Sequence, residues 1–95
     1  MTQTFRRYRN FDIGQVHATP EVLRTIPRED LLRGFTRHIS GDWGELCEFD
    51  RHENDRAMKL GRGLLSSYTD RNARRFWIIT EADRSATTLL LPEEY

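Results

Sequence analysis

Three residues in this sequence have the chemical types that cleave RNA without a metal ion. Such cleavage needs a base for the 2′-hydroxyl, an acid for the leaving oxygen and a cation for the charge that develops on phosphorus. Glu81, His38 and Arg84 supply these types, but His38 lies far along the chain from Glu81 and Arg84. They form a site only if the fold brings the helix end that carries His38 and Asp42 to the strand end that precedes Glu81. The alternative is that His38 interacts only with the last carbonyls of its helix.

A second group of polar residues follows the strand-like run RFWIIT at 75–80. Residues 81–85 predict a hairpin loop built around a type I turn, in which Asp83 accepts a hydrogen bond from the backbone near Ser85. The loop gathers donors, acceptors and both charges at one end of a sheet, where binding sites are often built. We therefore expect a partner-binding surface that comprises Asp42, Trp43, Glu81, Asp83, Arg84, Ser85, Thr87 and Thr88.

Trp43 has two interpretations that the sequence leaves open. It lies in a short turn between Gly41 and Gly44. An aromatic side chain in such a turn either packs back onto the core or stays exposed as an anchor for a partner.

Neither a metal site nor a catalytic nucleophile has a recognisable motif. The histidines, Cys47 and the nearby carboxylates show no C-x-x-C or H-E-x-x-H spacing. No serine has the G-x-S-x-G context, and the glycines do not form a phosphate-binding loop. We predict no metal and no cofactor.

The elements that must position these residues follow from capping signals and hydrophobic spacing. Residues 13–18 predict a short strand, Thr19-Pro20 predicts a helix start, and 28–39 predicts an amphipathic helix that places Leu31, Leu32, Phe35 and Ile39 on one face. Asp50 with Glu53 predicts the start of a further helix that Gly61 ends.

Strands at 64–68, 75–80 and 87–91 predict an antiparallel meander within residues 63–91. The fold class is α+β, with two to three N-terminal helices packed on a three- to four-stranded, mainly antiparallel sheet. Both parities of 75–80 are apolar, so the sequence does not choose which sheet face meets the helices.

The totals restrict the partners. Fifteen Lys and Arg residues balance fifteen Asp and Glu residues, so no net field draws the chain to nucleic acid or to a membrane. No apolar run approaches the length that spans a bilayer, and the single cysteine fits a reducing compartment. We expect a cytoplasmic protein with one domain at 11–95.

Residues 1–10 predict a basic flexible tail. Arg6, Arg7 and Arg9 alternate with Phe5 and Tyr8, a combination that can lie on a phosphate backbone and stack on bases. Binding of nucleic acid through the three arginines is therefore an alternative function.

Three stretches carry a resemblance to known proteins: RHISGDWGEL at 37–46, GLLSSY at 63–68 and WIITEADRSATTLLLPEEY at 77–95. Together they resemble a family of small uncharacterised bacterial proteins of plasmids, integrative elements and phages, labelled "plasmid-related" or hypothetical. The resemblance implies an accessory role in a mobile genetic element and transfers no catalytic residue.

These observations favour a non-enzymatic accessory protein that binds a protein partner, for example as an inhibitor of host defence or as a regulator. The main alternative is a metal-independent ribonuclease or toxin-like domain that uses His38, Glu81 and Arg84.

Overall fold

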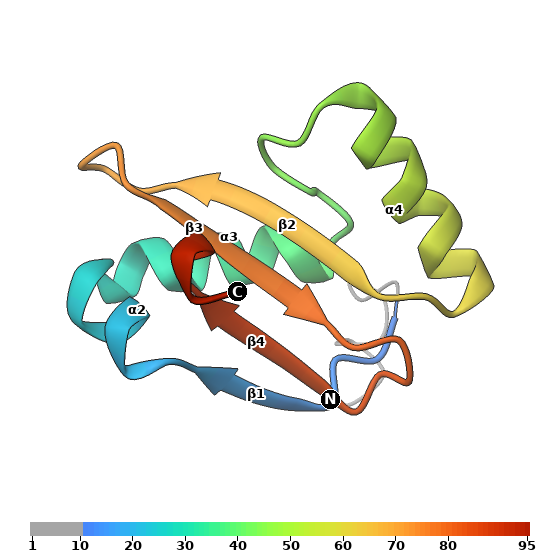
Figure 1. Ribbon diagram of the computed structural model, residues 1–95, viewed down its shortest axis with the longest axis horizontal. Helices are drawn as coiled ribbons and strands as arrows, with labels where there is room; N and C mark the ends of the chain where they lie inside the picture. The colour runs from blue at the N-terminus through green and yellow to red at the C-terminus, as the bar shows by residue number, and fades with distance from the viewer. Residues whose placement is uncertain (1–10) are drawn as a thin grey trace.

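A four-stranded sheet organises the computed structural model, which describes residues 11–95 (Figure 1). Its strands are β1 (Gln15–Ala18), β2 (Leu64–Thr69), β3 (Arg75–Thr80) and β4 (Ala86–Leu90), in the order β1-β4-β3-β2. β2, β3 and β4 form the predicted antiparallel meander. β1 joins β4 as a parallel neighbour, so the sheet is mixed.

The helices confirm the α+β class. α2 (Pro20–Thr25), α3 (Arg28–Ile39) and α4 (Glu48–Leu60) precede the meander, and a 3₁₀ turn, η1 (Pro92–Glu94), follows it. The helical segments are therefore not all N-terminal. In Figure 1, α3 lies behind the sheet and α2 lies at its left, near the ends of β1 and β4, whereas α4 lies beside β2 instead of covering a face.

The helix starts agree only in part with the predicted caps. The Thr19 hydroxyl accepts a hydrogen bond from the Val22 N–H at 3.1 Å, as the Thr-Pro signal predicted. α4 begins at Glu48 and has no side-chain cap, so the predicted capping box at Asp50 was wrong. The Arg51 side chain donates to the carbonyls of Leu46 and Gly44. These hydrogen bonds hold the segment that precedes α4, whose first turn lies earlier in the chain than predicted.

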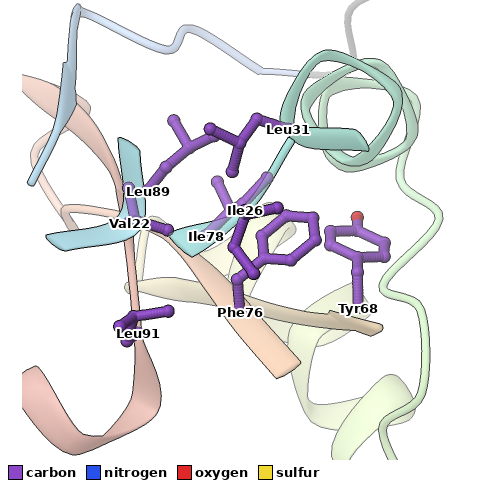
Figure 2. Close-up of a cluster of buried hydrophobic side chains, with 8 residues drawn as sticks. All are labelled: Val22, Ile26, Leu31, Tyr68, Phe76, Ile78, Leu89 and Leu91. Atoms are coloured by element: carbon purple, nitrogen blue, oxygen red, sulfur yellow. The ribbon is translucent and has the colours of Figure 1, made fainter. Parts of the chain in front are cut away.

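The main hydrophobic core lies between the sheet and helices α2 and α3 (Figure 2). Phe76 and Ile78 of β3 point into it, which settles the choice of face that the sequence left open. The cluster comprises Val22, Ile26, Leu31, Tyr68, Phe76, Ile78, Leu89 and Leu91. We call the opposite face, which carries Trp77 and Ile79, the outer sheet face.

α3 meets the core through Leu31 and Phe35, as predicted, but not through Leu32. Leu31, Gly34 and His38 are buried, whereas Leu32 is 60% exposed. A Cβ atom at Gly34 would lie 2.8 Å from ring atoms of Phe76, so the absence of a side chain allows the helix to approach the sheet closely. The prediction that Leu32 belongs to the apolar face was therefore wrong.

The edge of β2 that faces away from β3 is covered by side-chain and backbone hydrogen bonds. The Asn54 amide of α4 donates to the Leu65 carbonyl and accepts from the Leu65 N–H. Further along β2, the Ser67 N–H donates to the Trp43 carbonyl at 3.2 Å and the Glu45 N–H donates to the Ser67 carbonyl at 2.7 Å. These contacts give β2 the partners that a neighbouring strand would otherwise supply.

Within residues 11–95, no helix is long and apolar enough to cross a membrane.

Candidate functional site

The loop between β3 and β4 has the predicted hairpin geometry. The Glu81 N–H donates to the Ala86 carbonyl and the Arg84 N–H to the Glu81 carbonyl, both at 2.9 Å. The Ser85 N–H donates to the Asp83 carboxylate at 2.9 Å, as predicted. The hydrogen bonds from Ser85 also hold the pKa of Asp83 below its ordinary value. Glu81, Asp83 and Ser85 are exposed and remain accessible to a partner.

Arg84 is folded back onto the protein. Its backbone has a left-handed φ of 62°, and its guanidinium donates to the carbonyls of Arg62 at 2.7 Å and of Glu81 and Ala82 at 3.1 Å. A fourth contact, at 3.4 Å, reaches the Ala57 carbonyl near the end of α4. The C-terminal end of a helix carries a partial negative charge, so this position suits arginine. Both terminal nitrogens of the Arg84 guanidinium thus donate within the protein, contrary to its expected role in contacting a partner or a substrate.

Phe11 contacts both Arg84 and His38, two of the three predicted catalytic residues. The Arg84 guanidinium carbon is 5.7 Å from the centre of the Phe11 ring. The same ring contacts His38 edge-on, with 5.5 Å between the ring centres, and stacks on Trp43 at 6.1 Å. The Phe11 ring is therefore in contact with both His38 and the Arg84 guanidinium, which separates two of the residues of the predicted cleavage site.

His38 belongs to a buried hydrogen-bonded chain rather than to an open site. Its side chain is fully buried, with Nδ1 2.5 Å from the Ser66 hydroxyl and Nε2 2.9 Å from the Thr80 hydroxyl. The Thr80 hydroxyl is 2.7 Å from that of Thr87, which donates to the Ile13 carbonyl at 2.8 Å. We call this chain, from Ser66 to Ile13, the His38 network.

The His38 network accounts for two predicted site residues. Both nitrogens of His38 are engaged, so neither is free to transfer a proton to a substrate. Glu81 is exposed on the loop, outside this network. The structure therefore does not bring His38, Glu81 and Arg84 together as a cleavage site. Thr87 is fully buried, which corrects its assignment to a partner-binding surface.

Burial of His38 predicts a pH-dependent stability. Burial lowers its pKa from 6.5 to about 4, so the unfolded chain takes up a proton first as the pH falls. The stability contributed by keeping His38 neutral is fully present above pH 6.5. As the pH falls from 6.5 to about 4, the free energy of unfolding decreases by about 3 kcal/mol. Urea denaturation across this range measures the effect. A His38→Gln variant with the same pH dependence as the wild type would contradict it.

Trp43 is part of the core. It is 4% exposed and packs in a second cluster with Ala57 and Leu64. Its indole N–H donates to the Asp55 carboxylate at 2.9 Å, so the polar atom of the buried ring is satisfied. The structure thus selects core packing from the two interpretations and corrects the assignment of Trp43 to a partner-binding surface.

Asp42, in the same turn, stays half exposed. Its carboxylate accepts from Arg37 Nε at 2.8 Å and from the Gly44 N–H at 3.1 Å, and its carbonyl accepts from the Tyr68 hydroxyl. The hydrogen bond from Arg37 lowers the pKa of Asp42. Asp42 thus holds the turn in place, and its carboxylate remains partly accessible.

The outer sheet face carries a groove of about 500 Å³ that the sequence did not predict. Its floor and walls are mainly apolar and come from Leu65, Trp77, Ile79, Thr88, Leu90 and Tyr95, and Glu81 and Ala82 of the hairpin loop border it. The Trp77 and Tyr95 rings meet edge-on, with 5.9 Å between their centres. The sequence of β3 contained an indication of this groove, because side chains on both of its faces are apolar although the helices cover only one face. Of the predicted surface, Thr88 and Glu81 lie at this groove.

Two further predictions concern other ligands. Among residues 11–95, no three or more His, Cys, Asp or Glu side chains gather as they would around a metal ion. The basic tail at 1–10, with Arg6, Arg7 and Arg9, lies outside the described residues.

Comparison with known proteins identifies no relative. No protein-family model matches the chain, and no match is found among curated proteins or solved structures. The resemblance to small proteins of mobile elements therefore stays a prediction.

Proposed function

We propose that this protein acts by binding a protein partner through the groove on the outer sheet face. The observation that carries the proposal is a largely apolar groove of about 500 Å³ on the sheet face opposite α2 and α3. Apolar side chains left partly exposed in one continuous region are typical of an interaction surface.

Polar groups at the border of the groove support recognition of a specific partner. Glu81 is exposed at the loop end, and Thr88 contributes a hydroxyl from within the groove. Because Arg84 donates to four backbone carbonyls, it braces the loop against α4. A rigid loop loses little conformational freedom when a partner binds, which favours affinity.

The resemblance to plasmid-borne and phage-borne proteins favours an accessory role, such as inhibition of a host-defence protein or regulation of the element itself. We place this role in the cytoplasm, because a chain with one cysteine, Cys47, forms no internal disulfide.

Site-specific crosslinking in cells tests the proposal. We expect a photoreactive amino acid at Thr88, within the groove, to give one discrete protein adduct. The same amino acid at Thr36, exposed on α3, serves as the matched control and is expected to give no such adduct. Adding Trp77→Ala should abolish the Thr88 adduct because it removes the largest apolar contact in the groove.

Two checks make the crosslinking decisive. Circular dichroism must show that the Trp77→Ala variant is folded, so that a lost adduct reports on binding. The adduct protein, once identified and purified, must bind wild type more tightly than Trp77→Ala, by about tenfold or more. Equal adducts from Thr88 and Thr36, or equal affinities, would refute the proposal.

A further inference from the structure

The two edges of the sheet differ in a way that points to a second interaction surface. The edge at β2 is closed by Asn54 and by the segment from Trp43 to Glu45. The edge at β1 pairs only with β4 among the described residues. In Figure 1, β1 forms the lower border of the sheet.

The outward groups of β1 follow from its ladder with β4. The Gln15 N–H donates to the Ser85 carbonyl at 3.0 Å, and the Thr19 N–H donates to the Leu89 carbonyl at 3.1 Å. Alternate residues of a parallel strand face the same neighbour, so the N–H and C=O groups of Val16 and Ala18 point away from β4. Within residues 11–95, no hydrogen bond from a side chain or a loop reaches these groups.

β1 lacks the residues that commonly protect an exposed edge. Gln15, Val16, His17 and Ala18 include no lysine, arginine, carboxylate or proline. Val16 is 50% exposed although it is an apolar strand residue. A strand without formal charge can also pair with its own copy, because no like charges then face each other across the ladder.

We propose that β1 pairs with β1 of a second copy of this chain, in antiparallel orientation about a two-fold axis at His17. In this register, Val16 of each copy faces Ala18 of the other. Val16 of one copy and Ala18 of the other then exchange both of their backbone hydrogen bonds. A two-fold axis at Val16 or at Ala18 would not pair both outward-facing residues in this way. The pair joins the two sheets edge to edge and leaves the groove on the outer sheet face uncovered.

The molecular mass of the full chain tests the pairing. Light scattering after gel filtration, with loading concentrations up to about 1 mM, should give a mass that rises toward twice the monomer value of 11.3 kDa. Val16→Pro removes the outward N–H and is compatible with an edge strand, so this variant should stay at the monomer mass. Val16→Thr keeps the N–H and should associate like the wild type. A wild type that remains monomeric throughout, or a Val16→Pro variant that still dimerises, would overturn the proposal.

Disulfide trapping tests the register and does not depend on the folding of Val16→Pro. In a Cys47→Ser background, His17→Cys places two thiols opposite each other at a pair about 4.5 Å apart between Cα atoms, within the range for a disulfide. Oxidised glutathione should convert this variant to a covalent dimer many times faster than it converts a Thr36→Cys control in the same background. Equal rates for the two variants would overturn the proposed register. Because the groove takes no part, loss of dimerisation leaves the crosslinking result for the proposed function unaffected.

Discussion

Replacing His38 by alanine is expected to lower the free energy of unfolding by about 4 kcal/mol. The substitution leaves a cavity in a fully buried position. It also removes the hydrogen-bond partner of the Ser66 hydroxyl and one partner of the Thr80 hydroxyl, both inside the protein. Urea denaturation at neutral pH, followed by circular dichroism, measures the change.

His52→Ala provides the matched control for this prediction. It makes the same chemical change at an exposed position in α4, where we expect a loss below about 0.5 kcal/mol. Similar losses in the two variants would mean that the His38 network does not stabilise the fold. His38→Gln, whose amide can keep one of the two hydrogen bonds, should recover part of the loss.

Gly44→Ala is expected to destabilise the fold by about 4 kcal/mol, as a result of two effects. The residue has a left-handed φ of 77°, which costs about 1–2 kcal/mol for any residue with a Cβ atom. The new Cβ would also lie 2.1 Å from the Ser67 carbonyl oxygen, a clash with backbone that rotation of a side chain cannot relieve. The bridge between Gly44 and Ser67 must therefore open.

Gly61→Ala separates these two effects. Gly61 has a φ of 71° at the end of α4, close to that of Gly44, but an added Cβ would meet nothing within 4 Å. We therefore expect a loss of about 1 kcal/mol, from the backbone conformation alone. Equal losses at Gly44 and Gly61 in parallel denaturation experiments would show that the segment from Trp43 to Glu45 is not held against β2.

The parts of the fold that could be predicted are those determined by neighbouring residues. The limits of α3, the order of the three meander strands and the hydrogen bond from Ser85 to Asp83 depend on caps, alternation and turn residues a few positions apart. β1 was recognised as a strand, but its parallel pairing with β4 was not, since a four-residue strand carries no signal of its partner's direction.

The candidate site was harder to predict because its side chains are positioned by distant segments. Trp43 is buried against α4, and Arg84 donates to the carbonyls of Ala57 and Arg62 at the end of α4 as well as to two carbonyls of its own loop. His38 looked like a catalytic residue because its type was visible in the sequence, whereas its contacts with Ser66 and Thr80 were not. The groove is defined by the sheet face that the helices leave uncovered, and periodicity alone could not identify that face.

The Asn54 amide at the β2 edge has a consequence for how far such chains can assemble. With β2 closed, strand addition can proceed from β1 alone, and a two-fold pair then leaves no further edge to extend. If both α4 and the segment from Trp43 to Glu45 detached from β2, each chain would present a template at both edges of its sheet. Addition would then have no natural stopping point and would lead toward fibrils. The contacts that hold Asn54 and the segment from Trp43 to Glu45 against β2 thereby separate a finite assembly from open-ended polymerisation.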